Sequence, residues 1–290
     1  MKPLPSYPMR PKPFQTLAPG LGATDELSLR VSVAALVRLL FEHPYKDGLL
    51  LALERRATLH TTPNGDVVEI KSQPFGGALR IHDIRPLQAL IGDFHFDSEE
   101  SRSERDFRIF IRPSAWKTLQ AFCVAHLTQP NDSVLESDPT RELSEELADT
   151  LGIGLKRDQY VFQALATLVE DEPSATENLS ARGYPTVRIY RIFEARILDS
   201  SLASALVRNS ETCSDQDLHA LVSQDVQKGR HGRANAVLAV PLKEVTSFYL
   251  ATSWEARNRP VWFQGHQLDE TVAAVLENVS VPKYRRVEEY

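Results

Sequence analysis

Three glutamates, Glu142, Glu145 and Glu146, have the residue type and spacing that could do chemistry. A helix advances about 100° per residue, so side chains at positions i, i+3 and i+4 share one face. Three like charges on one face repel each other unless a cation offsets them, and Mg²⁺ or Mn²⁺ prefers such carboxylate oxygens. The carboxylates alone also allow a plainer interpretation, a glutamate-rich helix face that meets only water.

The residues around these glutamates predict the helix that would position them. Asp138 is a favourable N-cap residue, and Pro139 suits the first helical position, where its missing N–H costs nothing. Leu143, Leu147 and Leu151 form an apolar stripe beside the acidic face. We expect this stripe to point into a core, which would hold the acidic face at its edge.

A pair of glycines, Gly76 and Gly77, precedes the helix along the chain. Adjacent glycines let a backbone approach a ligand closely, although a plain turn would also explain them. The segment 141–146, Arg-Glu-Leu-Ser-Glu-Glu, is similar to the helical half of the Nudix box, and 75–80 resembles the paired glycines that precede that box. The chain thus resembles the Nudix hydrolase superfamily. The resemblance implies an α/β fold, a Nudix-like α/β/α sandwich with a mixed β-sheet.

The same resemblance implies a reaction, the Mg²⁺- or Mn²⁺-dependent hydrolysis of a diphosphate linkage in a nucleoside diphosphate derivative. Glu142, Glu145 and Glu146 would be the metal ligands, with Glu142 also able to act as the base that positions water. Arg141 would orient a carboxylate by a charge-assisted contact.

Further site residues are expected on the same grounds. The expected substrate-binding residues are Arg55, Arg56, Gly76, Gly77 and Arg80. Some Nudix enzymes, notably ADP-ribose pyrophosphatases, use an acidic residue in a loop after the box as the base, and Glu170 or Glu172 could serve in that way. A solvated strand end explains Arg55 and Arg56 just as well, and an acidic surface loop is the plainer interpretation of Glu170 and Glu172.

The sequence also departs from the family pattern. Residues 78–140 separate the glycines from the helical half of the box, which normally lie close together. Ser133 stands where the box has a glutamate, and Glu136 is nearby but out of register. Ala148 and Asp149 replace the closing glycine and apolar residue. These departures favour the alternative of a catalytically inactive Nudix-like module that binds a nucleotide or a protein.

The hydrophobic pattern predicts how the chain is organised. Residues 1–26, rich in proline, are expected to form an N-terminal arm, and 27–290 a Nudix-like domain with an insertion at about 81–135. In that insertion we expect an ordered hairpin-and-helix subdomain, with strands at 94–96 and 107–111 around an exposed tip at 97–106 and a helix at 114–127 capped by Ser114. Strands are predicted at 29–41, 49–56, 67–70, 160–169, 186–195 and 236–242, and helices at 215–228 and 268–279.

Composition limits the possible partners. With 290 residues, 42% of them hydrophobic, the chain has material for a sizeable core. A net charge of −6 disfavours a nucleic-acid-coating protein, so we expect no nucleic acid as partner. The Nudix resemblance implies a nucleotide-derived small molecule instead. Cys123 and Cys213 lack a metal-type spacing.

No apolar run predicts a signal peptide or a membrane span, so the expected compartment is the cytoplasm, and a homodimer is possible.

Overall fold

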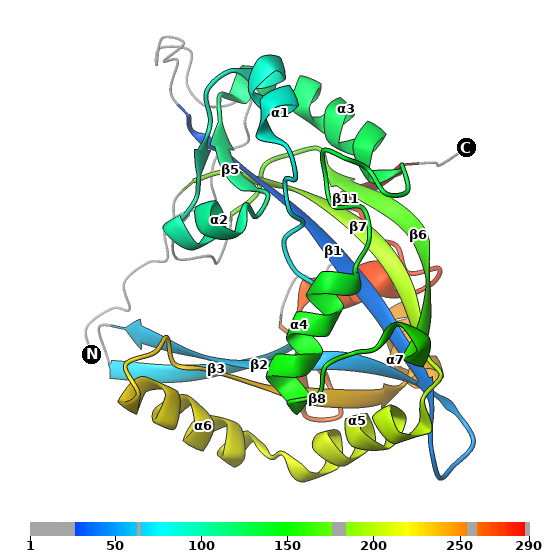
Figure 1. Ribbon diagram of the computed structural model, residues 1–290. Helices are drawn as coiled ribbons and strands as arrows, with labels where there is room; N and C mark the ends of the chain where they lie inside the picture. Colours follow the sequence, from blue (N-terminus) through cyan, green and yellow to red (C-terminus); the bar gives the residue numbers. More distant parts are fainter. Residues whose placement is uncertain (1–26, 63–64, 176–183, 254–259, 288–290) are drawn as a thin grey trace.

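One mixed β-sheet organises the part of the chain that the structure, a computed structural model, describes (Figure 1). The described residues are 27–62, 65–175, 184–253 and 260–287. The central strand β1 (Leu29–Glu42) runs parallel to β7 (Thr186–Ile197) and pairs antiparallel with the start of β2 (Leu49–Thr62). β1 is buried almost throughout, as its apolar, β-branched sequence predicts.

The other elements extend the sheet and cover it. The remaining strands are β3 (Gly65–Pro74), β4 (His95–Phe96), β5 (Arg108–Ile111), β6 (Tyr160–Glu170), β8 (Arg233–Pro241), β9 (Val261–Phe263), β10 (His266–Leu268) and β11 (Tyr284–Val287). The α-helices are α1 (Ile84–Ile91), α2 (Glu99–Glu104), α3 (Trp116–Leu127), α4 (Thr140–Leu151), α5 (Ser200–Thr212), α6 (Asp215–Gln227) and α7 (Leu242–Ala251). The main strand order is β11-β6-β7-β1-β2-β3-β10-β9, with β8 paired to β2 and β5 paired to β1.

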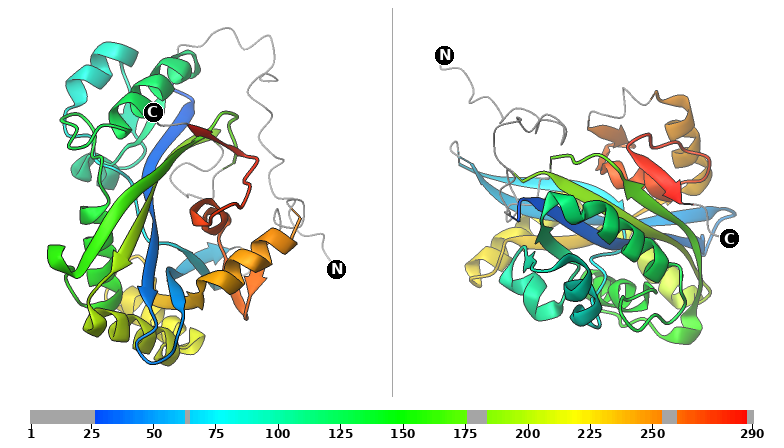
Figure 2. Two further views of the ribbon diagram at one scale, coloured as in Figure 1. Left: turned by 90° about the vertical axis from the view of Figure 1, so that its right-hand side faces the viewer. Right: turned by 90° about the horizontal axis from the view of Figure 1, so that it is seen from above.

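Helices lie on both sides of this sheet, as Figure 2 shows. On one side, α4 and α5 share a core with β1, β2 and β7. On the other side, α7 and the 3-10 helix η5 (Glu270–Val275) pack on apolar residues of β1, β2 and β8. The predicted α/β/α sandwich with a mixed sheet is therefore confirmed. Within the described residues, none of the helices is long and apolar enough to cross a membrane.

The segment predicted as an insertion contains α1, β4, α2, β5 and α3 and is ordered, but it shares its core with the sheet. β5 pairs antiparallel with the beginning of β1, and the apolar faces of α1 and α3 pack on β1 and β7. The segment 97–106 joins the antiparallel strands β4 and β5 and is mostly exposed, as expected, but it contains helix α2, capped by Ser98, and its Asp97 is buried in an ion pair with Arg30. A capping serine followed by Glu99 and Glu100 explains why this charged segment is helical rather than a loop.

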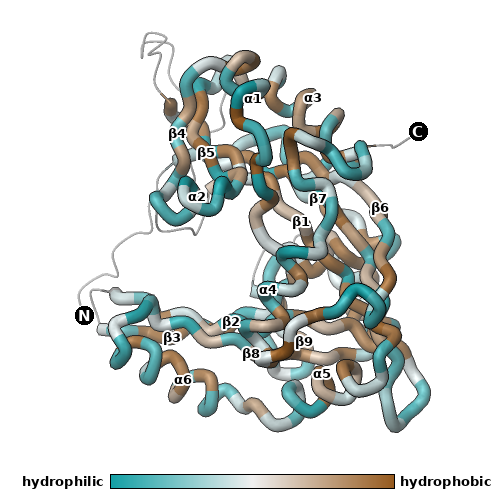
Figure 3. The backbone as a smooth tube through the Cα atoms, in the orientation of Figure 1, coloured by the Kyte–Doolittle hydropathy of each residue, from teal (hydrophilic) through white to brown (hydrophobic). Residues whose placement is uncertain are grey.

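Two further element predictions need correction. Ser114 does not cap α3, because residues Pro113–Ala115 form a 3-10 turn and the helix begins at Trp116. The closing helix expected at 268–279 is instead strand β10 followed by η5, in which Val272 and Val275 are buried at 3-10 spacing. Strand β5 is largely hydrophobic, whereas the neighbouring helix α2 is mostly hydrophilic (Figure 3). The predicted Pro-rich arm, 1–26, lies outside the described residues.

Candidate functional site

Helix α4 is anchored by its apolar side and presents its acidic side to the glycine turn. Leu143 and Leu147 are fully buried in the core shared with α5, which confirms the predicted apolar stripe. The helix begins at Thr140, one residue later than predicted, and the Asp138 carboxylate still accepts a hydrogen bond from the Thr140 N–H at 2.8 Å. Gly152, with a left-handed φ of 67°, ends the helix.

Arg141 holds three carboxylates together. Its Nε and Nη2 atoms donate to both oxygens of Glu136 at 2.9 and 2.7 Å, a bidentate contact. Its Nη2 atom also lies 2.5 Å from Glu142 Oε1, and its Nη1 atom donates to Glu145 at 2.8 Å. A further bond, at 3.1 Å, reaches the carbonyl oxygen of Ala78, just after the glycine pair. Arg141 therefore orients carboxylates and ties α4 to the turn.

Glu136 is a site residue that the sequence pattern missed. It stands five residues before Arg141 rather than at the expected position of Ser133. Two hydrogen bonds join Glu136 to the backbone of Arg80: the Glu136 N–H donates to the Arg80 carbonyl at 2.9 Å, and the Arg80 N–H donates to the Glu136 carboxylate at 3.0 Å. The family spacing did not identify Glu136 because the chain approaches α4 from the insertion. The path of the chain, not a fixed spacing, decides which carboxylate lies beside Arg141.

The glycine pair touches the acidic face of α4, as expected. The Gly76 N–H donates to Glu146 Oε2 at 2.5 Å. Gly76 has a φ of 136°, and a Cβ there would lie 2.1 Å from the Ala35 carbonyl oxygen, so only glycine fits. A Cβ on Gly77 would lie 2.0 Å from Glu142 Oε2. The missing side chains of this turn thus make room for the backbone and for the Glu142 carboxylate.

Strand β2 adds a second arginine, the predicted Arg56, to the site. It also adds Glu54, a carboxylate that the sequence analysis did not single out. The Arg56 Nη2 atom lies 2.7 Å from Glu54 Oε2 and 3.1 Å from Glu146 Oε1. Glu54 is fully buried, and Gln73 donates a hydrogen bond to its Oε2 at 3.0 Å. The only available signal was the alternation of side chains along a strand, which places residues 54 and 56 on the same face.

Burial and crowding raise the pKa values of the central carboxyl groups. Burial raises the pKa of Glu142 to about 7, against the opposing pull of Arg141. Burial, together with the nearby Glu54 charge, also holds the pKa of Glu146 well above its ordinary value. Carboxyl groups of this kind are strained when ionised and would be stabilised by a cation.

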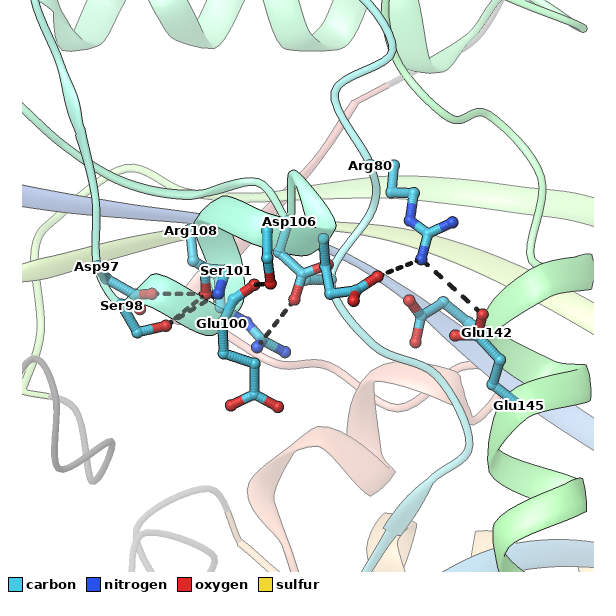
Figure 4. Close-up of polar contacts among 12 residues, drawn as sticks. Arg80, Asp97, Ser98, Glu100, Ser101, Asp106, Arg108, Glu142 and Glu145 are labelled. Carbon is cyan, nitrogen blue, oxygen red and sulfur yellow. Dashed lines mark hydrogen bonds and ion pairs between the residues drawn. The ribbon is translucent and has the colours of Figure 1, made fainter.

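The insertion contributes its own charges to the edge of the site, as Figure 4 shows. Arg80 donates to Glu104 of α2 at 2.6 Å, and its Nη2 atom lies 4.0 Å from Glu145 Oε1 of α4. Asp106 forms an ion pair with Arg108 at 3.2 Å, and burial raises its pKa. The insertion therefore lines the same edge of the site as α4.

Three of the predicted site residues lie elsewhere. Arg55 is buried on the face of β2 opposite to Arg56 and bonds Asp215 of α6 at 2.8 Å. Glu170 is fully buried and paired with Arg188 at 2.8 Å and Lys283 at 3.2 Å. Glu172 is exposed after β6. In the described residues no hydrogen bond or ion pair joins any of these three to α4.

The carboxylates that could hold a divalent cation are occupied by arginines. Among the described residues, no three histidine, cysteine, aspartate or glutamate side chains converge as a preformed cation site. The donor set nevertheless fits such an ion, since Glu54, Glu142 and Glu146 offer only oxygens, as Mg²⁺ and Mn²⁺ prefer. In addition, Glu54 Oε1 is buried without a hydrogen-bond partner in the described part of the chain.

Comparison with known proteins identifies the family. The model of the SMODS-associated NUDIX domain matches residues 28–243, more than half of the chain. No curated protein and no solved structure matches the chain. The match confirms the predicted resemblance to the Nudix superfamily, and it supports a hydrolase of the Nudix kind, a group whose enzymes generally use divalent metals. The chain belongs to the SMODS-associated NUDIX domain family and thereby to the Nudix superfamily.

Proposed function

We propose that this protein is a divalent-cation-dependent Nudix hydrolase that cleaves a diphosphate linkage in a nucleoside diphosphate derivative. The observation that supports the proposal most directly is the contact of two largely buried carboxylates, Glu142 and Glu146, with the backbone of Gly76 and Gly77. Buried carboxylates with raised pKa values, set against a glycine backbone, suit an ion that binds phosphate oxygens.

The acidic residues of α4 would hold the cation. Glu142 and Glu146 point toward the glycine turn, and Glu145, whose side chain is 53% exposed, faces the edge of the site that Arg80 and α2 line. A bound Mg²⁺ would neutralise charge that develops on the leaving phosphate and would make a coordinated water more acidic. Arg141 would be a positioning residue that fixes the Glu142 and Glu145 carboxylates.

Glu142 is the residue that we assign as base. With a pKa of about 7, its carboxyl group is near the balance between holding and releasing a proton at neutral pH, which suits general acid–base work. The side chains of Arg56 and Arg80 are 38% and 32% exposed beside the carboxylates, so they could contact the phosphates of a substrate. Glu172 remains exposed after β6 and has no assigned role.

A turnover assay tests the proposal. Full-length protein would be incubated with a panel of nucleoside diphosphate derivatives, with and without Mg²⁺, and released phosphate or nucleoside monophosphate would be measured. Glu146→Gln should lower Mg²⁺-dependent turnover by about 100-fold or more, because it removes a buried charged ligand. Glu211→Gln, an exposed helical glutamate on α5, is the matched control and should retain turnover. Turnover of Glu146→Gln equal to that of the wild type would refute the assignment.

A second candidate, a nucleotide-binding module without catalysis, is supported by the ion pairs themselves. Arg141 and Arg56 together contact Glu136, Glu142, Glu146 and Glu54, so each of these carboxylates already has an arginine partner without any cation. If this arrangement persists in solution, the wild type binds a nucleotide but releases no product with any member of the panel. Binding measured in parallel with turnover therefore separates the two candidates.

A further inference from the structure

Glu54 on β2 is a buried charge with an unsatisfied oxygen. Its side chain has no exposed surface, and its Oε2 atom accepts from Gln73 and pairs with Arg56. Within the described residues, its Oε1 atom has no hydrogen-bond partner. Leaving a buried carboxylate oxygen unpaired is costly, so such an atom calls for an explanation, and a cation that binds there is one of the usual ones.

Arg56 occupies the space between this carboxylate and that of α4. One nitrogen, Nη2, lies 2.7 Å from Glu54 Oε2 and 3.1 Å from Glu146 Oε1. The two carboxylates carry two negative charges, and Arg56 supplies one positive charge. A divalent cation at the same place would balance both carboxylates, whereas the guanidinium leaves one charge over in a buried setting.

The two carboxylates and the arginine between them differ in how freely they can move. The side chains of Glu54 and Glu146 are 0% and 12% exposed, and Gly76 further fixes Glu146. The Arg56 side chain is 38% exposed, so its long stem can turn away from the carboxylates toward solvent. The carboxylates are therefore the fixed part of the arrangement, and the guanidinium is the part that can be replaced.

We propose that Glu54 is a further ligand of the divalent cation, together with Glu146, and that the Arg56 guanidinium holds the place of that cation until it binds. This inference rests on the proposed function, since it concerns the same metal site. It also gives Arg56 two successive partners, the carboxylates before the cation binds and the phosphates of a substrate afterwards. In the described residues no three ligands converge on one point, because Arg56 lies between the carboxylates that would otherwise do so.

Direct binding of Mn²⁺ to the full-length protein tests the assignment without relying on activity. Free Mn²⁺ is measured by electron paramagnetic resonance, and binding heat by calorimetry. Glu54→Gln keeps the size of the side chain and removes its charge, so the dissociation constant for Mn²⁺ should rise about tenfold or more. The matched control is Glu194→Gln on β7, which removes one carboxylate from another arginine pair, that with Arg38, and should bind Mn²⁺ as the wild type does.

A second variant probes the arginine itself. Arg56→Met keeps an unbranched stem and removes the positive charge that competes with the cation. We expect it to bind Mn²⁺ several-fold more tightly than the wild type, and Mn²⁺ should raise its melting temperature more than that of the wild type, because a ligand that binds only the folded state stabilises it. This variant decides the matter if Glu54→Gln does not fold.

The outcomes separate this inference from the proposed function. Weaker Mn²⁺ binding by Glu54→Gln and tighter binding by Arg56→Met support it. Wild-type Mn²⁺ affinity in Glu54→Gln, or unchanged or weaker affinity in Arg56→Met, overturns it while leaving Glu142 and Glu146 as ligands of a working hydrolase. A wild-type protein that binds no Mn²⁺ overturns both the inference and the cation-dependent function.

Discussion

A methyl group added at Gly77 should disable the site while leaving the fold intact. A Cβ at this position would lie 2.0 Å from Glu142 Oε2 and 2.8 Å from its carboxyl carbon, whereas ordinary contacts begin near 3.4 Å. The backbone of Gly77 is not in the left-handed region, so Gly77→Ala introduces no backbone strain. The carboxylate must therefore withdraw by about 1 Å or more, and a displacement of this size can lower a rate by about 100-fold.

Two other glycines are matched controls for this variant. Gly154→Ala places its Cβ in open space, so it should retain both stability and turnover. Gly76→Ala would strain a φ of 136° and push its Cβ to 2.1 Å from a backbone oxygen of Ala35 in β1, so we expect a loss of about 2–4 kcal/mol of unfolding free energy.

The assay combines thermal melting of each variant with Mg²⁺-dependent turnover on the substrate panel. The expected result is a wild-type melting temperature for Gly77→Ala with turnover reduced by about 100-fold, and a lowered melting temperature for Gly76→Ala. If Gly77→Ala keeps wild-type turnover, the position of the Glu142 carboxylate does not matter for the reaction, and the assignment of Glu142 is refuted. If Gly77→Ala melts as early as Gly76→Ala, the added methyl group destabilises the fold, and the expectation that it affects only the site is refuted.

Three further predictions concern charge and thiol chemistry. Burial holds the pKa of Glu142 at about 7, above the ordinary 4.5, so the folded state favours the protonated form and loses stability as the pH rises from 4.5 through 7. In denaturant titrations without divalent cations, Glu142→Gln should therefore gain up to about 3 kcal/mol relative to the wild type across this range, and a pH-independent difference would contradict the shift. Arg141→Met leaves the buried carboxylates of Glu136 and Glu142 uncompensated, so unfolding free energy at pH 8 should fall by about 3 kcal/mol; a change below about 0.5 kcal/mol would show that the ion pairs contribute little. Iodoacetamide at pH 8 should label Cys213, which is partly exposed, and spare Cys123, whose thiol pKa is strongly raised by complete burial; mass spectrometry that finds Cys123 labelled in the native protein would show that this core opens readily.

Local patterns in the sequence were sufficient where one segment contains its own partners. The acidic and apolar faces of α4 follow from a 3.6-residue period, and β1 follows from a run of buried, β-branched residues. The Arg-Glu-Leu-Ser-Glu-Glu segment and the Gly76–Gly77 pair were enough to place the chain in its superfamily, which the family match confirmed. Predictions failed where short-range signals competed, as in the capped helix α2 and the 3-10 helix η5.

The partners of the acidic helix were decided only by the tertiary structure. Glu136 reaches Arg141 because the insertion returns the chain beside Arg80, and no spacing rule anticipates that path. Arg56 joins Glu54 to Glu146 because β2 and α4 share a core, although the two glutamates are far apart in the sequence. The sequence by itself determined which helix carries the carboxylates, since a helical face is a local property. Which charges stand opposite that face depends on how distant strands pack, and packing is a property of the whole chain.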